Sequence, residues 1–163
     1  MKRLKSRSDL KKLGQEILTR ARGKRIVSVT NGTDGRTRGS QNVVQAFITE
    51  IERQGLNEKV EIKGTGCHGF CEKEPTALIL PEEICYIQVQ PGDAEEIVSQ
   101  TIMEKKIIDR LLYIDPTTGK KIAHESEIPF YRNQMRLVVG NNRKIDPKKI
   151  EDYLALGGYS ALA

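Results

Sequence analysis

The chain has 163 residues, a net charge of +5 and a hydrophobic content of 37%. This length suits one ordinary domain, or a small domain with an extension. No apolar run approaches the length of a membrane span, and no hydrophobic signal segment begins the sequence. We therefore expect a cytoplasmic protein without a membrane span, in which paired cysteines indicate metal or redox chemistry more than a disulfide.

The positive charge is concentrated at the start of the chain. Residues 1–25 contain ten Lys and Arg against two acidic residues, whereas the remainder contains 17 against 20. The spacing of leucines predicts a helix over 8–22, with Ser8 as its N-cap and Gly23 at its end. Nucleic-acid surfaces interleave aromatic side chains with their charges, and the first Phe here is Phe47. We interpret this segment as a solvated helix facing an acidic partner protein, and expect no nucleic-acid partner.

The next part of the chain has the order of a β-α-β unit. A β-branched run predicts a strand over 24–30, followed by a glycine-rich loop over 31–40 and an amphipathic helix over 41–55. A second strand is expected over 59–66, and it delivers Cys67 at its end. The loop between strand and helix is where a phosphate could bind, but its sequence matches neither the dinucleotide fingerprint nor the P-loop.

A β-β-α pattern follows. Two strands over 75–80 and 82–90 flank an acidic turn and predict a hairpin. A long helix is expected over 92–112, with Asp93 as its cap. Together these elements predict a mixed α/β fold of the thioredoxin-like type, with helices packed on a mixed sheet over about 24–112.

The character of the sequence changes after residue 112. Turn residues dominate 113–131, which predicts a linker or extended arm. A short strand is expected over 136–142, followed by a helix that starts after Asp146 with Pro147 at its first position.

Three parts of the chain are therefore expected. They are a basic helix over 1–23, the thioredoxin-like domain over 24–112, and a third section over 113–163. The sequence stops abruptly at Ala163, which we interpret as a truncation, with a naturally short paralogue as the alternative.

The stretch TGCHGFCEKEP, residues 65–75, carries the clearest chemistry. Cys67 and Cys71 are separated by three residues in a glycine-containing loop, a layout suited to binding iron or zinc. An iron-sulfur cluster needs four anionic sulfur ligands, yet the chain has three cysteines in all.

The remaining candidate ligands add little. Cys85 shares a strand face with Ile87 and Val89, so we interpret it as a small buried apolar residue. His68 lies inside the motif, but two thiols with one histidine at this spacing do not match the usual zinc units. His124 lies in the turn-rich section, and nothing in the sequence supports a nucleophilic enzyme.

Two separated regions resemble a known family. The TGCHGFCEKEP stretch, its hairpin and PGDAEEIV resemble the thioredoxin-like 2Fe-2S ferredoxin domain of the NADH-binding flavoprotein subunit of complex I and NAD(P)-reducing, electron-bifurcating hydrogenases. Residues 130–163 resemble the entry into the flavin domain of those subunits. The resemblance implies an oxidoreductase whose other subunits are partners of this chain, with self-pairing left open. It also places FMN, NAD and 4Fe-4S binding in a C-terminal part that this sequence lacks.

The resemblance also implies which residues would bind the cluster. The family uses two cysteine pairs, and the second pair matches Cys67 and Cys71. The first pair falls on Thr30 and Gly35, so two thiolate positions are vacant. Asp34 next to Gly35 offers an oxygen ligand instead. We expect a peripheral, cluster-less ferredoxin-like module that serves packing and subunit contact; the alternative is an electron-transfer domain with an unusually ligated 2Fe-2S cluster.

Three explanations of the cysteine pair thus stay open at this stage. The pair is a relic of an electron-transfer site, half of a cluster that another chain completes, or a thiol pair that works alone.

Overall fold

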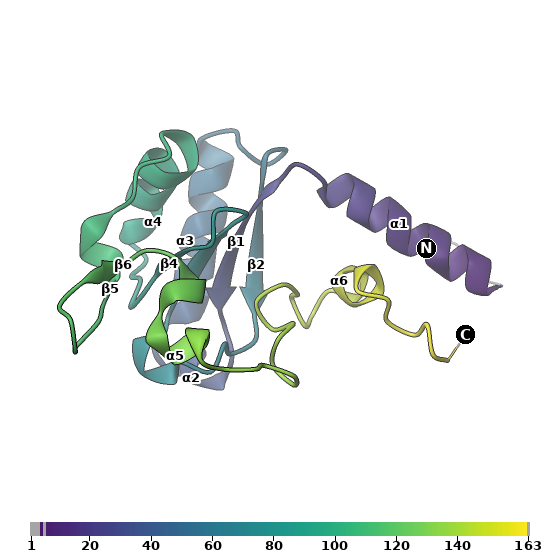
Figure 1. Ribbon diagram of the computed structural model, residues 1–163. Helices are drawn as coiled ribbons and strands as arrows, with labels where there is room; N and C mark the ends of the chain where they lie inside the picture. Colours follow the sequence, from purple (N-terminus) through teal and green to yellow (C-terminus); the bar gives the residue numbers. More distant parts are fainter. Residues whose placement is uncertain (1–3, 5, 163) are drawn as a thin grey trace.

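The computed structural model describes residue 4 and residues 6–162 (Figure 1). The two strand-rich units expected from the sequence are present in the expected order. The elements are α1 (Arg7–Ala21), β1 (Arg25–Thr30), α2 (Thr33–Thr37), α3 (Ser40–Arg53), β2 (Val60–Thr65), β3 (Ala77–Leu80), β4 (Ile84–Tyr86), α4 (Asp93–Glu96), β5 (Tyr113–Ile114), β6 (Lys121–Ile122), α5 (Pro129–Arg132) and α6 (Ile150–Ala155). No helix in this part of the chain is long and apolar enough to cross a membrane.

The main sheet has the strand order β2-β1-β3-β4. β1 and β2 are parallel, joined by the crossover helix α3, while β3 pairs antiparallel with both β1 and β4. This is the mixed thioredoxin-like arrangement that the sequence pattern predicted. Because β1 and β2 are parallel, their carboxyl ends meet at one edge of the sheet, where Thr30 faces Thr65 in register.

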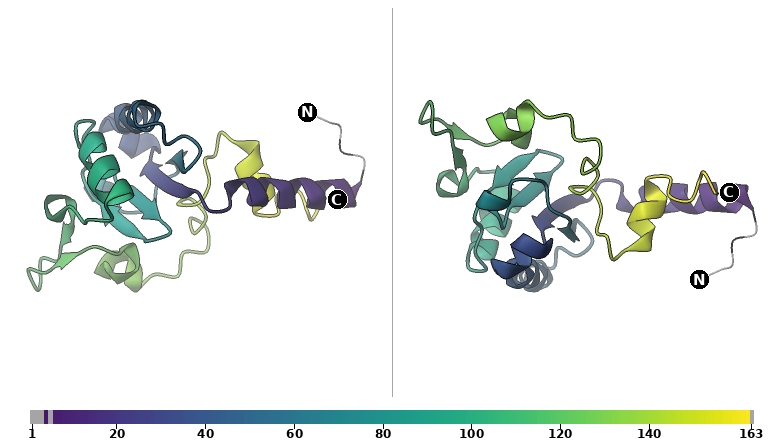
Figure 2. Two further views of the ribbon diagram at one scale, coloured as in Figure 1. Left: turned by 90° about the horizontal axis from the view of Figure 1, so that it is seen from above. Right: turned by 90° about the horizontal axis from the view of Figure 1, so that it is seen from below.

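One face of the sheet is covered by α3 and α4 (Figures 1 and 2). Alternate strand residues point toward these helices, since successive side chains of a strand face opposite sides. Phe47 of α3 is completely buried in this layer. The apolar residues of the strands in this core are Val27, Val29, Val60, Ala77, Ile79, Ile84 and Tyr86.

The other face of the sheet is covered by residues that follow α4. Leu78 and Cys85 point to this side and pack against Tyr113, Ile128 and Tyr131. The section 113–131, expected as a linker, therefore supplies part of this second core. It contains the small β5-β6 hairpin and the single turn of α5, which lies in front of the sheet in Figure 1.

A buried carboxylate fixes this section to the cysteine loop. Glu125 is 0% exposed. Its Oε2 accepts hydrogen bonds from Arg136, at 3.2 Å, and from Arg143, and its Oε1 lies 3.5 Å from Nδ1 of His68. Burial alone would raise the pKa of Glu125, but His68 and Arg136 outweigh burial and lower the pKa to about 2.

The two terminal helices lie side by side and project away from the sheet (Figures 1 and 2). Gly14 of α1 makes this approach close, since a Cβ there would lie 3.2 Å from the carbonyl oxygen of Leu154 in α6. A buried ion pair ties α6 to the sheet: Nζ of Lys63, on β2, donates to Oδ1 of Asp152 at 2.8 Å.

Some predicted elements differ in their boundaries at the start of the chain. The N-cap of α1 is Ser6, whose hydroxyl accepts from the amide of Asp9, and the prediction of Ser8 was wrong. Gly23 ends this helix with a positive φ, as predicted. The loop over 31–40 contains the short helix α2, because its glycines do not interrupt a single turn.

The prediction of one long helix over 92–112 is wrong in its second half. α4 continues as a π-helical segment over Ile97–Met103 and then ends, because Lys105 adopts a positive φ. Ile108, Leu111 and Leu112 of the following segment instead pack into the core, around a 3₁₀ turn at Asp109–Leu111. Asp93 does not cap the helix in the predicted way; its carboxylate accepts from the amide of Gln90.

The C-terminal section also corrects the sequence prediction. No strand forms over 136–142 in the structure, where turns leave Val138 94% exposed. An apolar pair such as Leu137 and Val138 forms a strand only when a neighbouring strand offers hydrogen bonds, and none lies alongside. α6 starts at Ile150, after the predicted position, and ends as expected before Gly157, which has a positive φ.

Replacing Asp152 tests the attachment of α6 to the sheet. Asp152→Ala removes the shortest contact of the buried Lys63 ammonium group, which keeps only the carboxylate of Glu61 at 3.8 Å and the carbonyl of Lys144 at 3.4 Å, so the cost should be about 1–3 kcal/mol. We expect the free energy of unfolding in urea to fall by this order. The exposed neighbour Glu151, replaced by Ala, is the matched control and should change the stability by less than about 0.5 kcal/mol. Equal effects of the two variants would contradict the buried pair.

The Glu125 network predicts a specific pH dependence of stability. A carboxyl group whose pKa is lowered on folding, here from 4.5 to about 2, stabilises the fold above its unfolded pKa and loses this effect as the pH falls. The shift corresponds to about 3 kcal/mol. Urea unfolding at pH 6 should show Glu125→Gln to be less stable than the wild type, and the difference should shrink between pH 4.5 and pH 2. The exposed Glu127→Gln variant should follow the wild-type curve.

Candidate metal centre

The candidate site lies at the edge of the sheet where β1 and β2 end. The parallel pairing brings the loop after β1 beside the loop after β2, as expected from the resemblance. The contact is direct: a Cβ built on Gly32 would lie 3.2 Å from the backbone nitrogen of Cys67. The loop carrying the vacant positions and the loop carrying the thiols therefore form one site.

Cys67 and Cys71 present their sulfur atoms to one another. The two Sγ atoms are 3.4 Å apart and are not bonded in a disulfide. Two thiolates on one tetrahedral metal ion are about 3.8 Å apart when each metal–sulfur bond is about 2.3 Å, so this separation is close to that of a shared ion. The backbone amide of Gly69 donates to Sγ of Cys67 at 3.1 Å, the type of contact that supports metal-bound sulfur.

Glu74 joins the two thiols through a local turn. Residues Cys71–Lys73 form a 3₁₀ turn, and the amide of Glu74 donates to the carbonyl of Cys71 at 3.2 Å. Side chains three residues apart overlap along a 3₁₀ turn, so Cys71 and Glu74 point to the same side. The ligand atoms of Cys67, Cys71 and Glu74 all lie within 4.8 Å of one another.

The thiols are protonated at neutral pH when no metal is bound. Burial raises the pKa of Cys67 to about 12, and the Glu74 carboxylate, which accepts a hydrogen bond from the thiol, adds to the effect. The Asp34 carboxylate, a hydrogen-bond acceptor that favours the protonated thiol, raises the pKa of Cys71. Since the thiolate is the reactive form, a thiol pair that works alone would react slowly here. A metal ion would have to displace both thiol protons.

Both vacant family positions are closed to a new ligand. The hydroxyl of Thr30 is buried and accepts from the amide of Thr76 at 2.9 Å, so it supports the junction of β1 with β3. A Cβ on Gly35 would lie 2.8 Å from the carbonyl oxygen of Thr30 and 3.0 Å from Oε2 of Glu74. No side chain fits at Gly35 unless its surroundings move.

The other candidates from the sequence have separate surroundings. His68 is buried, and its Nε2 lies 3.2 Å from the hydroxyl of Thr65 while its other nitrogen faces Glu125. Cys85 is 2% exposed, as expected for a small core residue; Ile87 packs with it, whereas Val89 lies in the other core. Nδ1 of His124 lies 3.0 Å from a backbone carbonyl.

Sequence reasoning missed Glu74. It reads as one of several charged residues in an exposed turn after the second cysteine. Its spacing of three residues from Cys71 could have indicated it, provided that a 3₁₀ turn had been expected there.

The C-terminal section lies against the cysteine loop. Nδ2 of Asn142 donates to the carbonyl of Cys67 at 2.9 Å, and a Cβ on Gly66 would lie 3.0 Å from the Asn142 amide. The hydroxyl of Ser28 donates to the carbonyl of Arg143 at 2.9 Å. On the other side, Phe70 stacks on Phe130 with ring centroids 4.3 Å apart. These contacts hold the loop in place from both sides.

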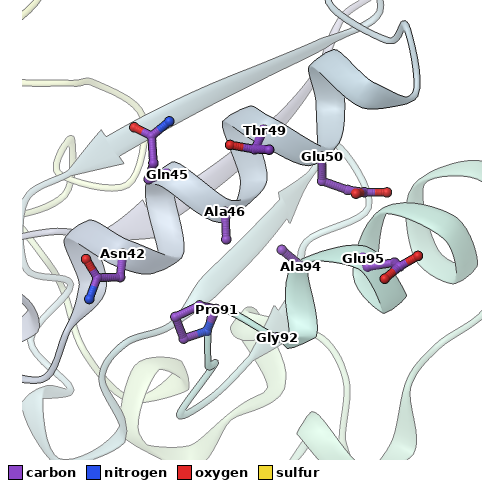
Figure 3. Close-up of a pocket in the computed structure, with 9 residues that line it drawn as sticks. All are labelled: Asn42, Gln45, Ala46, Thr49, Glu50, Pro91, Gly92, Ala94 and Glu95. Carbon is purple, nitrogen blue, oxygen red and sulfur yellow. The ribbon is translucent and has the colours of Figure 1, made fainter.

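A shallow groove between α3 and α4 is a weaker candidate (Figure 3). Its volume is about 440 Å³, and its lining contains none of the site residues above. The titratable residues that line it are Glu50 and Glu95, and both pair with Arg53. Its acidic groups are therefore already satisfied, and the lining offers no thiol or imidazole.

Comparison with known proteins identifies the family of this site. No family model matches the chain. A 2Fe-2S ferredoxin of Clostridium pasteurianum is 32% identical over 75 residues, which span 46% of this chain and 74% of that protein. A 2Fe-2S ferredoxin of Aquifex aeolicus (strain VF5) is 34% identical over 76 residues, 46% of this chain and 68% of that protein.

Solved structures agree with these sequence relatives. The wild-type thioredoxin-like [2Fe-2S] ferredoxin from Aquifex aeolicus is 29% identical and has a TM-score of 0.51, covering 54% of this chain and 94% of that one. A cysteine-to-serine variant of the same ferredoxin is 28% identical with the same TM-score, covering 53% and 95%. With its β-α-β-β-β-α order and its cysteine pair after the end of β2, the chain belongs to the thioredoxin-like 2Fe-2S ferredoxin family.

Proposed function

We propose that this chain is an electron-transfer module whose 2Fe-2S cluster is bound by Cys67 and Cys71, with oxygen ligands in place of the two missing thiolates. The observation that carries the proposal is the arrangement of these two thiols 3.4 Å apart beside a buried carboxylate, in a chain of the 2Fe-2S ferredoxin family. We thus favour the alternative from the sequence analysis, an electron-transfer domain with an unusually ligated cluster, over the cluster-less role.

The residues present fit such a group by their chemistry. Two thiolates supply the soft ligands that iron-sulfur clusters use, and carboxylates also bind iron in proteins. Glu74 lies with the thiols, and Asp34 lies beside Cys71. The amide of Gly69 already points at the Cys67 sulfur. A cluster held there would accept and release one electron at a time.

The protein controls the site by burial and by charge. Cys67 and Cys71 are only partly exposed, and Glu74 is 2% exposed. Limited solvent access and hydrogen bonds to sulfur are the means by which a protein sets the reduction potential of a cluster. Phe70 and its aromatic neighbours shield the loop on the side of the second core.

We further propose that the parent of this module is an NADH-linked oxidoreductase of the cytoplasm. The resemblance of residues 130–163 to the entry of a flavin domain supports this parent. In it, the partners of the chain would be the flavin-binding part and the other subunits. FMN, NAD and 4Fe-4S binding would belong to the flavin-binding C-terminal part of that parent, as the resemblance implies.

A cluster-less module for packing and subunit contact is the second candidate. The closed surroundings of Thr30 and Gly35 favour it, because neither position has room for a restored ligand. The two candidates make opposite predictions about bound iron.

Iron and sulfide analysis tests the proposed function. After anaerobic purification or reconstitution, we expect two irons and two sulfides per chain with visible absorption, because the 2Fe-2S composition defines the proposed group. Cys67→Ser and Cys71→Ser should each lower the iron content by about tenfold or more. Residues that only support a metal ligand already cost about tenfold in affinity when they are replaced, and a ligand should cost at least as much. Cys85→Ala is the control. It also removes one of the three thiols, but the protein should keep its iron because Cys85 lies in the core. Wild-type protein without iron and sulfide would favour the cluster-less candidate.

Reduction by NADH tests the proposed parent. The tagged chain is isolated anaerobically with its natural partners, and its electron paramagnetic resonance spectrum is followed after NADH is added. We expect a reduced-cluster signal with the partners present and none with these 163 residues alone, because no glycine-rich flavin loop lies within them. If the isolated complex binds no NADH and transfers no electron from NADH, the proposal of an NADH-linked parent is wrong.

A further inference from the structure

Glu74 is a buried carboxylate without a cationic partner. It is 2% exposed, and among the residues that the structure describes no nitrogen or hydroxyl donates to either of its oxygens; the Cys67 thiol is the group that faces it. Its neighbour Lys73 pairs with Glu72 instead, through a 2.7 Å contact. An isolated buried carboxylate is costly, since such groups are normally paired or bind a metal.

The position of Glu74 indicates what it binds. Its carboxylate lies within 4.8 Å of both Cys67 and Cys71 sulfur atoms. No Lys, Arg or His forms an ion pair with it in the described part of the chain, and three potential ligands surround one small volume. A metal cation in that volume would satisfy all three groups together.

Glu74 also occupies the space of a missing thiolate. Its Oε2 is 3.0 Å from the place where a side chain at Gly35 would begin. In the family pattern, that side chain would be a cysteine ligand. An oxygen donor now reaches the same volume from the opposite loop, on the same turn as Cys71.

We propose that Glu74 is a metal ligand of this site and replaces the thiolate missing at Gly35. The inference deepens the proposed function and rests on it for the identity of the metal, which is the iron of the cluster. Asp34 is a weaker choice because it is exposed, and His68 is engaged by Thr65 and Glu125. The site thus changes from four thiolates to a mixed set of sulfur and oxygen ligands.

The test compares Glu74→Gln with Glu72→Gln in the full chain. Gln keeps the shape of Glu but removes its charge, and Glu72 is an exposed carboxylate two residues away that serves as the matched control. Both variants and the wild type are reconstituted with iron and sulfide, and iron content and the electron paramagnetic resonance spectrum are recorded. We expect Glu74→Gln to retain about tenfold less iron, or to show a changed spectrum, while Glu72→Gln matches the wild type.

A second measurement keeps the inference separate from the proposed function. The metal-free proteins are titrated with Co²⁺, whose thiolate absorption reports binding at the cysteines. A weaker affinity of Glu74→Gln, by about tenfold, supports the ligand role even if the wild type holds no cluster. If the wild type holds iron and sulfide but Glu74→Gln is unchanged in iron, spectrum and Co²⁺ affinity, the proposed function stands and the ligand role of Glu74 is wrong. Circular dichroism and urea unfolding confirm that both variants are folded.

Discussion

The parallel pairing of β1 with β2 is the constraint on which the site depends. It places the ends of two strands that are far apart in sequence at one edge of the sheet, with Thr30 facing Thr65. The loop after β1 and the loop after β2 therefore lie next to each other. Whatever this site binds, its ligands come from these two loops and from the turn that leads into β3.

Two buried glutamates show how the fold treats structural and functional charge differently. Glu125 contacts His68 and two arginines, so its charge stabilises the fold and holds the C-terminal section against the cysteine loop. Glu74 is as deeply buried, yet it has no such partners in the described structure. The difference is one of charge: cationic side chains surround Glu125, whereas no cationic side chain among the described residues pairs with Glu74, which makes Glu74 a candidate for binding a cation. The contrast is the main structural reason for assigning metal binding to Glu74.

The section after α4 has a larger structural role than a linker. Tyr113, Ile128 and Tyr131 complete the second core, and Asn142 contacts the backbone of Cys67. The site is consequently enclosed by residues from beyond the strand-helix-strand unit that carries the thiols. This enclosure leaves the two thiols only partly exposed and packs side chains against both sides of the cysteine loop, which suits the proposed electron-transfer role.

Replacement of thiolates by carboxylates has a chemical consequence. Carboxylates are harder ligands than thiolates and share less electron density with iron, so the same fold would hold a cluster with different electronic properties. Loss of two cysteines is therefore compatible with retained iron binding, provided that a buried oxygen donor is at hand. In the proposed site that donor is Glu74, which directly follows the 3₁₀ turn at Cys71–Lys73.

The amino-acid sequence by itself determined the strand and helix order, the thioredoxin-like class and the two thiols, because apolar periodicity and cysteine spacing are local properties. It also indicated that Thr30 and Gly35 occupy ligand positions, through the resemblance. Only the tertiary structure decided that Glu74 reaches the thiols, that α4 ends early and that residues 136–142 form no strand. The physical reason is common to all three: each depends on which groups from distant parts of the chain surround a residue, and local propensity cannot encode these surroundings.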